Sequence, residues 1–361
     1  MRKVLSIVLA AIMALAILTG CGNTAGSSSA SVSGISSSGS SKSTGGSGKL
    51  VVYSALNDDD MVTLSQQFKK DTGIDIEYIT LSGGDATARV QAEKDNPQAD
   101  VVVGGSVDLY GSLKDAGALA AYDSPNNDDL DAMFSDTDHC WQGWYMGVQC
   151  IILNTDRFDK ELAPKGLERP KTWDDLLDSR YKDVLVWANP STAGGAYIFT
   201  ACQIFRLGED KAWEYLKALD ANVHHYYEAA GGVISPVATG EFITSIAWAH
   251  DSFKIKQQGY PMEIIIPTDT AFEIGGAAVI AGAKNEENAQ KFIDWLLTPE
   301  IQKLNTSISY RYSVRDDVAS PEGLPKLSEL SLVDYDRQKA ADMKKDVQTK
   351  FESEIISKRA N

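Results

Sequence analysis

Residues 49–79, KLVVYSALNDDDMVTLSQQFKKDTGIDIEYI, decide the fold. The apolar run at 50–53 is typical of a buried strand, and apolar residues at helical spacing predict a helix over 60–70. Residues 74–79 then alternate between apolar and polar as a half-buried strand does. This strand–helix–strand order indicates an α/β fold.

The same alternation continues along the chain, whose 361 residues suggest two domains. Two apolar stretches, 144–154 and 274–280, mark passages between the two lobes, and the first is longer than most single strands. We therefore assign 49–146 and 274–300 to lobe 1, and 147–273 and 301–361 to lobe 2. Apolar residues also recur at helical spacing in the tail, which predicts an amphipathic helix that something must cover; they are Ala340, Met343, Val347, Phe351 and Ile355.

The N-terminus has the form of an export signal. Arg2 and Lys3 precede a short apolar run that ends in Leu-Thr-Gly-Cys at Cys21. This ending resembles a bacterial lipobox, so we expect residues 1–20 to be a lipoprotein signal peptide and Cys21 to carry the lipid; an ordinary secretory signal is the alternative. Residues 21–48, rich in Ser and Gly, are typical of a flexible tether. The protein is then expected outside the cytoplasm, on the outer face of the cytoplasmic membrane.

Composition excludes several classes of function. A net charge of −16 disfavours a general basic surface for nucleic acid. Four cysteines in all exclude a disulfide-stapled scaffold. A bridge between Cys140 and Cys150 stays open, with buried thiols as the favoured alternative, and no Cys-x-x-Cys spacing indicates a metal or redox site.

Small residues follow four of the expected strands and open the helices after them. Ligands of open α/β sheets bind beyond the carboxyl ends of the strands, where helix N-termini offer free N–H groups to an anion. Gly and Ser also serve as ordinary caps and turn formers in such loops. We favour a ligand site because four such turns recur; its candidate residues are Ser54, Ala55, Gly83, Gly84, Gly105, Ser106, Ser191, Thr192, Ala193 and Gly194.

Several stretches resemble a known family, the bacterial extracellular solute-binding proteins of ABC importers. They are Val51–Ala55, Arg89–Glu93, Pro97–Val101, Gly104–Gly105, Lys171–Leu176 and Thr270–Ile280. The nearest group is the ferric-iron-binding-like cluster, which includes binders of phosphonates and hexose phosphates. The resemblance implies a type 2 periplasmic-binding fold: two α/β lobes, a hinge, and a ligand held in the cleft between them. It also implies an ABC permease as partner, and we expect a monomer without a cofactor.

The resemblance also bears on the ligand. Iron binders of the cluster carry adjacent tyrosines after the second-lobe strand, where this chain has His250 and Asp251. Together with Glu273, this pair is similar to the hexose-phosphate and phosphonate members, so we expect a phosphorylated sugar or a phosphonate and no metal. Ferric iron and polyamines remain alternatives, the latter because Trp248, Asp251, Asp269 and Glu273 could enclose a cation. We interpret His224–Tyr227 as a solvated turn.

An extracellular enzyme is the chief rival class. The sequence contains no Gly-x-Ser-x-Gly and no His-Glu-x-x-His motif. We therefore expect no catalytic activity. A lipoprotein that senses a ligand for a membrane receptor is a third class, which the sequence does not separate from an importer component.

Overall fold

The computed structural model describes residues 48–359. The expected leader, Cys21 and the tether up to residue 47 lie outside these residues. The strands are β1 (Lys49–Ala55), β2 (Asp75–Thr80), β3 (Val101–Ser106), β4 (Gln142–Asn154), β5 (Leu185–Ala188), β6 (Val223–Tyr227), β7 (Thr244–Trp248), β8 (Met262–Ile265) and β9 (Phe272–Val279). The α-helices are α1 (Asp58–Thr72), α2 (Gly83–Ala92), α3 (Tyr110–Asp115), α4 (Thr155–Glu161), α5 (Gly194–Leu207), α6 (Glu209–Asp220), α7 (Ile234–Ala238), α8 (Ala249–Lys256), α9 (Glu286–Leu296), α10 (Pro299–Ser309), α11 (Arg337–Phe351) and α12 (Ser357–Arg359).

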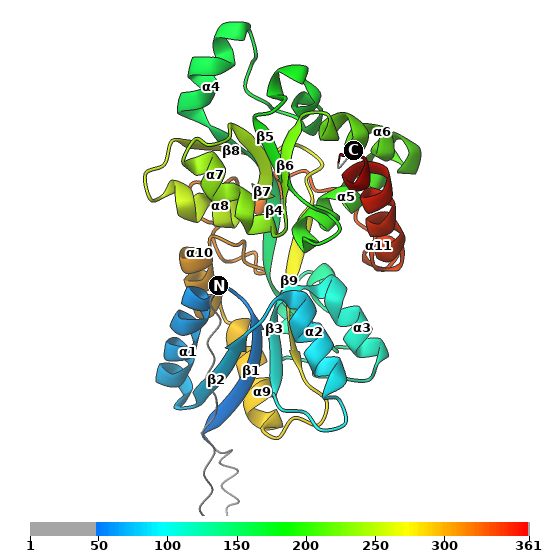
Figure 1. Cartoon of the computed structure of the whole chain (residues 1–361). Helices are drawn as coiled ribbons and strands as arrows, with labels where there is room; N and C mark the ends of the chain where they lie inside the picture. Colours follow the sequence, from blue (N-terminus) through cyan, green and yellow to red (C-terminus); the bar gives the residue numbers. More distant parts are fainter. Residues whose placement is uncertain (1–47, 360–361) are drawn as a thin grey trace, which may run out of the picture. The chain divides into compact units, whose positions relative to one another are not determined.

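The strands form a continuous series in the order β2-β1-β3-β9-β4-β7-β5-β6, with β8 also paired to β4. In lobe 1, β2, β1 and β3 are parallel and β9 is antiparallel to β3. In lobe 2, β7, β5 and β6 are parallel and β7 is antiparallel to β4. The predicted two-lobed α/β architecture is confirmed (Figure 1).

Strands β4 and β9 pair with each other at the centre of the series and run between the lobes. The first half of β4 pairs with β9, and its second half pairs with β7 and β8. All 13 residues of β4 are buried, which fits its largely apolar sequence; Gln142, Gln149 and Asn154 are its polar exceptions. On β9, Gly275 lies flat against the Tyr145 ring: a Cβ there would be 1.9 Å from Tyr145 Cζ.

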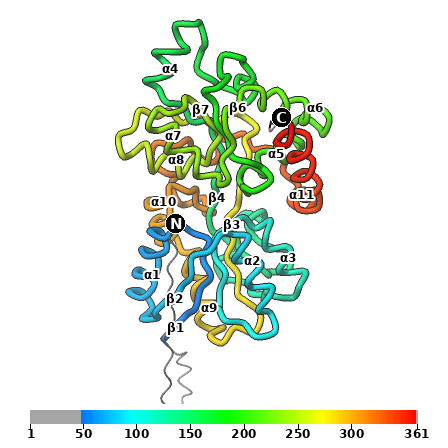
Figure 2. The backbone as a smooth tube through the Cα atoms, in the orientation of Figure 1, coloured from blue at the N-terminus to red at the C-terminus, as the bar shows by residue number. Residues whose placement is uncertain are grey.

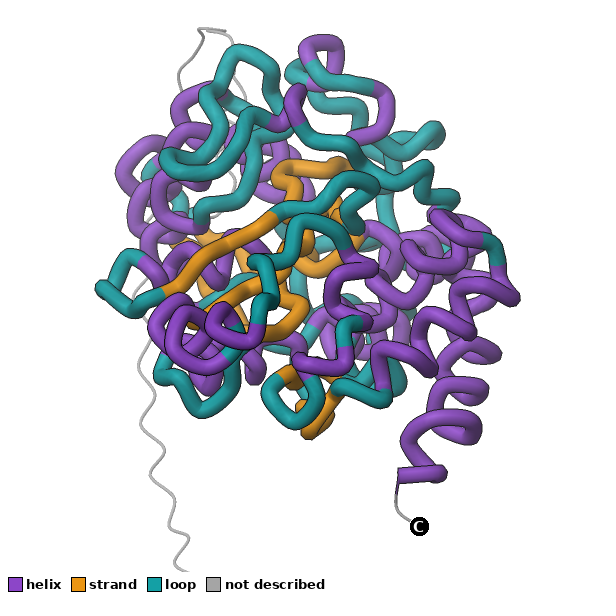
Figure 3. Tube along the Cα trace, turned by 90° about the horizontal axis from the view of Figure 1, so that it is seen from above, coloured by secondary structure: helices purple, strands orange, loops and turns teal. Residues whose placement is uncertain are grey.

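Helices cover both faces of the lobe 1 sheet. Met61 and Phe68 of α1 pack on the side of β1 that carries Leu50, whereas Val90 of α2 packs on the side that carries Tyr53. Figures 2 and 3 show the helices lying outside the strands. The carboxyl ends of β1 and β3 face lobe 2. The small-residue turns of lobe 1 lie at these strand ends.

Three features differ from the sequence interpretation or complete it. Residues 223–227 form the edge strand β6, paired to β5, so the interpretation of His224–Tyr227 as a turn was wrong. The Cys140 and Cys150 thiols are both free, with Cys150 and Cys202 buried and Cys140 half-buried. Among the described residues, no helix is long and apolar enough to cross a membrane.

Candidate functional site

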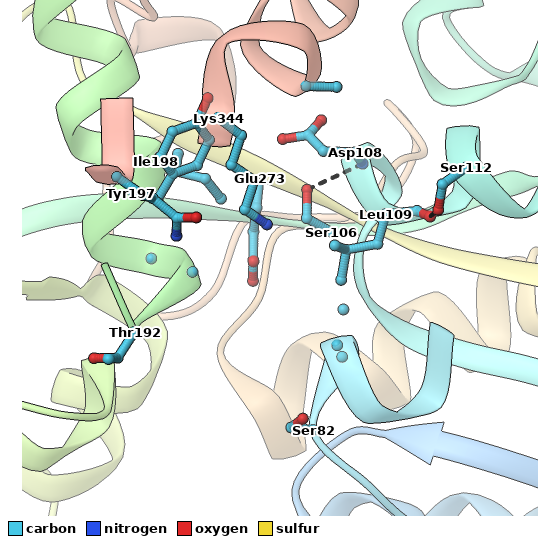
Figure 4. Close-up of a pocket in the computed structure, with 17 residues that line it drawn as sticks. Ser82, Ser106, Asp108, Leu109, Ser112, Thr192, Tyr197, Ile198, Glu273 and Lys344 are labelled. Atoms are coloured by element: carbon cyan, nitrogen blue, oxygen red, sulfur yellow. Dashed lines mark hydrogen bonds between the residues drawn. The ribbon is translucent and has the colours of Figure 1, made fainter. Parts of the chain in front are cut away.

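A cavity of about 550 Å³ lies between the two lobes. Lobe 1 contributes the N-terminus of α2, the end of β3 and the short 3-10 helix η1 (Val107–Leu109). Lobe 2 contributes the N-terminus of α5, while β9 contributes Glu273 and α11 contributes Ala341, Lys344 and Gln348. Figure 4 shows these side chains converging from three directions.

The lobe 1 wall is made largely of backbone. Gly83 and Gly105 approach so closely that a Cβ on Gly105 would lie 3.4 Å from Gly83 Cα. Gly105 also has a φ of +70°, a conformation that glycine adopts readily. Ser82 and Ser106 cap the helices that follow, since their hydroxyls accept from Asp85 N at 3.1 Å and Asp108 N at 3.3 Å. Backbone and small polar groups are thus what this wall presents.

The lobe 2 wall is the first turn of α5. Its N-cap residue is Ala193, so no side chain caps the helix, and its first N–H groups are left for another acceptor. Gln149 of β4 fixes this turn by donating to the Gly195 carbonyl at 2.6 Å. The positive end of the α5 dipole therefore opens on the cavity beside Thr192.

Helix α11 forms a third wall that the sequence analysis did not place in the site. Gln348 donates to the carbonyls of Pro190 at 3.0 Å and Ser191 at 3.3 Å, and Ser191 Oγ donates to the Gln348 carbonyl at 3.2 Å. These bonds fix α11 against the turn that precedes α5. Lys344 is the one Lys or Arg among the residues that line this cavity of the described chain.

Among residues 48–359, Glu273 of β9 is one of the two carboxylates that line the cavity; the other is Asp108. Burial raises the pKa of Glu273 to about 7, although the positive charge of Arg311 acts in the opposite direction. Glu273 is therefore partly protonated near neutral pH and can both donate and accept hydrogen bonds. A Cβ on Gly147 would lie 3.3 Å from Glu273 Oε1 and 2.8 Å from His250 Cε1, so the two side chains meet over this glycine.

His250 and Asp251 lie behind Glu273 and do not line the cavity. Burial, together with the charge of Arg311, lowers the pKa of His250 to about 3, so its imidazole is neutral. Its Nδ1 is buried without a hydrogen-bond partner, and its Nε2 lies 3.5 Å from Asp251 Oδ2. Asp251 Oδ1 in turn accepts from Asn57 of lobe 1 at 3.4 Å.

A buried cluster of charges lies next to this pair, around Asp60 of α1. The Asp60 carboxylate pairs with Arg311 at 3.1 Å and with Lys254 of α8 at 2.7 Å. The Arg311 guanidinium also stacks on the Tyr145 ring, 4.7 Å from its centroid. Asp60 and Lys254 belong to different lobes, so this cluster joins the lobes by direct ion pairing.

The structure brings part of the predicted site together in the cavity wall. Those residues are Gly83, Gly84, Gly105, Ser106, Thr192, Gly194 and Glu273. The other small residues lie nearby. Ser54 is buried with its hydroxyl accepting from Leu56 N at 3.2 Å, and Ala55 lies beneath Gly105. Ala193 is buried in the turn before α5, where the Ser191 hydroxyl donates to the Gln348 carbonyl. Sequence reasoning missed Asp108, Lys344 and Arg311. Only the amphipathic pattern of the tail gave a signal for α11.

Two lobes joined by two crossing strands, with a cavity between them, define a class of binding proteins that close around a small solute. The family described as bacterial extracellular solute-binding protein matches residues 63–330, which is most of the chain. The protein belongs to this family, whose members are solute-binding components of ABC importers. The resemblance inferred from the sequence is confirmed.

Individual relatives agree with this assignment. An uncharacterized protein of Haemophilus influenzae is 31% identical over 318 residues, covering 85% of this chain and 91% of the relative. A Salmonella typhi protein named "Putative 2-aminoethylphosphonate-binding periplasmic protein" is 27% identical over 259 residues, covering 70% of this chain and 73% of the relative.

Solved structures give the same result. The periplasmic binding protein AfuA from Actinobacillus pleuropneumoniae, with fructose-6-phosphate bound, superposes with a TM-score of 0.77 at 30% identity, covering 85% of this chain and 98% of AfuA. Polyamine-binding and iron-binding proteins also resemble this chain, at 25% identity for the former and 19% for the latter. These relatives are binding proteins rather than enzymes.

Proposed function

We propose that this protein captures a small organic molecule that carries a phosphate or phosphonate group. The observation that carries the proposal is the wall of the cavity: the uncapped first turn of α5 faces the close approach of Gly83 and Gly105. Free N–H groups and bare backbone are suited to an anionic oxygen cluster. The AfuA relative, at 30% identity, was solved with fructose-6-phosphate, and the Salmonella typhi relative is named for a phosphonate.

We assign to Glu273 the hydrogen bonds with the polar part of the ligand that carries no phosphorus. A carboxyl group whose pKa is about 7 can accept from one hydroxyl and donate to another acceptor. His250 supports this group from behind, where the two side chains meet over Gly147. Asp251 extends the support toward lobe 1 through its bond with Asn57.

The cavity fits a polyamine less well. Asp269, one of the four residues that could enclose a cation, does not line it, and its carboxylate accepts from Ser331 Oγ at 2.9 Å. Trp248 stacks on His250 with ring centroids 5.9 Å apart. The exposed end of the α5 dipole would also repel a cation.

The described residues offer no cluster of side chains suited to bind ferric iron. In residues 48–359 no group of three His, Cys, Asp or Glu side chains is arranged to hold a metal ion. Tyr226 lies on the edge strand β6, and its hydroxyl donates to Asp220 at 3.0 Å. These contacts support an organic anion over iron.

Calorimetry and a thermal-shift assay test the ligand class with fructose 6-phosphate, 2-aminoethylphosphonate, spermidine and ferric citrate as probes. A ligand at a hundredfold excess over its Kd stabilises the folded state by about 2.7 kcal/mol. We expect a shift with one of the two phosphorus compounds. A shift with spermidine alone or ferric citrate alone would overturn the assignment, and release of phosphate from fructose 6-phosphate or 2-aminoethylphosphonate would indicate an enzyme.

The proposed cellular setting is the outer face of the cytoplasmic membrane, with lipid on Cys21 and delivery of the ligand to a permease. The lipobox-like ending at Cys21 supports it, and two or more acyl chains anchor a protein stably. Labelling with palmitate and membrane fractionation test the anchor. We expect label on the wild type and none on Cys21→Ser; a membrane-bound, labelled Cys21→Ser protein would contradict it.

A further inference from the structure

Helix α11 lies outside residues 63–330, the part of the chain that matches the solute-binding family, yet it forms one wall of the cavity. Its C-terminal half rests on lobe 2. Phe351 is fully buried against the Trp187 and Tyr226 rings, with centroids 5.9 and 5.8 Å away. Gln348 adds the bonds to Pro190 and Ser191 described above. These contacts attach the C-terminal half of α11 to this lobe.

The N-terminal end of α11 reaches lobe 1 instead. Arg337 lies 3.5 Å from Asp108 of η1, and the Tyr335 hydroxyl lies 3.5 Å from the same carboxylate. Burial raises the pKa of Asp108, and the charges of Arg337 and then Lys344 oppose this. Figure 1 shows α11 beside α5. One helix thus contacts both walls of the cavity.

Between these two attachments, α11 turns one side toward the cavity. Ala341, Lys344 and Gln348 are spaced by three and four residues, so they lie on one face of the helix. Lys344 Nζ is 5.5 Å from the centroid of the Tyr197 ring, in the first turn of α5. Figure 4 shows Lys344 beside Tyr197, with Ser106 and Asp108 across the cavity.

We propose that Lys344 is a specificity-determining residue that binds the phosphate or phosphonate group together with the N–H groups of α5. This inference rests on the proposed function, because it names the side chain that recognises the anionic group. The remaining charged residues of the cavity are the acids Asp108 and Glu273. Lys344 therefore supplies the positive side-chain charge that an anion requires at this place.

A matched pair of variants tests the assignment. Lys344→Met removes the charge and keeps the length of the side chain, whereas Lys345→Met makes the same change at the exposed neighbouring position, which does not line the cavity. Calorimetry with fructose 6-phosphate and 2-aminoethylphosphonate measures Kd at two KCl concentrations. We expect Lys344→Met to weaken binding about tenfold to a hundredfold, the range for a hydrogen bond to a charged group, and to reduce its dependence on KCl. Lys345→Met should bind as the wild type does.

Lys344→Arg keeps the charge and should recover most of the affinity, which a merely structural loss would not show. Equal Kd values for the wild type and Lys344→Met, with either phosphorus compound bound, would overturn this inference and leave the proposed function intact. Binding of spermidine alone by the wild type would overturn both. The unliganded melting temperature of Lys344→Met is measured alongside, and an unchanged value attributes the lost affinity to the contact itself.

Discussion

The two sides of the junction between the lobes differ in whether their polar groups are paired with each other. On the α5 and α11 side, glycine backbone lines a cavity onto which the first turn of α5 opens, and no side chain in residues 48–359 caps this helix. On the α1 and α8 side, Asp60, Arg311 and Lys254 are paired with each other. We therefore expect charge near the hinge to stabilise the fold where it is paired, and to be available to a ligand where no ion pair holds it.

The largest expected effect comes from breaking the paired side. Asp60→Asn removes the charge that both Arg311 and Lys254 face, and Arg311 is only 6% exposed. Loss of one partner of a buried ion pair costs about 3–5 kcal/mol. Urea denaturation should show a loss of this size. Asp59→Asn, an exposed neighbour in the same helix turn, is the control and should change little; equal effects for both variants would contradict the buried-cluster interpretation.

The next effect is a pH dependence that arises on the open side. The pKa of Glu273 is about 7 in the folded protein, above its usual value of 4.5, so the folded state binds more protons over this interval. Stability from this group is therefore full below about pH 4.5 and is lost as the pH rises through about 7, by an amount on the order of 3 kcal/mol.

Denaturation of the wild type and Glu273→Gln at pH 5 and pH 8 measures this loss. The variant should lose less stability than the wild type between the two pH values, because Gln does not titrate. Glu322→Gln, at an exposed loop position, should follow the wild-type profile. Parallel profiles for the wild type and Glu273→Gln would show that Glu273 titrates normally.

Binding on the open side should respond to a charge placed at Thr192. Thr192→Asp puts a carboxylate at the mouth of the α5 wall, where it would repel a phosphate by an energy on the order of 2 kcal/mol, about thirtyfold in Kd. Thr192→Asn introduces a side chain of the same shape as Asp but without the charge, and it should bind the ligand nearly as the wild type does. Calorimetry with fructose 6-phosphate or 2-aminoethylphosphonate decides the matter, and a spermidine affinity that survives in Thr192→Asp would favour a cationic ligand.

The smallest effect is expected at the rim of the paired side. Asn57 donates to Asp251 across the lobes at 3.4 Å in an exposed setting, and it makes no side-chain cap to α1. Asn57→Ala should cost about 0.5 kcal/mol or less, since exposed polar contacts contribute little. If Asn57→Ala lowered the free energy of unfolding as much as Asp60→Asn, the exposed contact would contribute as much stability as the buried one, which would contradict the comparison.

Local patterns predicted most of the architecture. The strands were predictable because buried strands are continuous apolar runs, and the glycine turns because close backbone approach is a property of the residue itself. Strand β6 was missed because His224 and His225 are exposed on an edge strand, so no apolar run marks it. The position of Lys344 was missed because contact between residues 197 and 344 depends on packing that no periodicity encodes.

The same distinction applies to His250 and Asp251. Their place directly after strand β7 was predictable, but the direction of their side chains depends on Glu273, Arg311 and Asn57, which come from three distant segments. His250 is buried behind the cavity wall, whereas Asp251 is half-buried and contacts Asn57 of lobe 1. Sequence position alone does not contain that information.

The attachment of α11 also affects the order in which the protein acquires its binding site. Every other residue that lines the cavity precedes residue 337 in the chain, and Ala341, Lys344 and Gln348 follow all of them. The bonds between Gln348 and the turn before α5 join residues that are 157 and 158 positions apart, so they close a long loop. We therefore expect this third wall to form after the local strand–helix units of each lobe, and the ligand site to be complete only once the wall is in place.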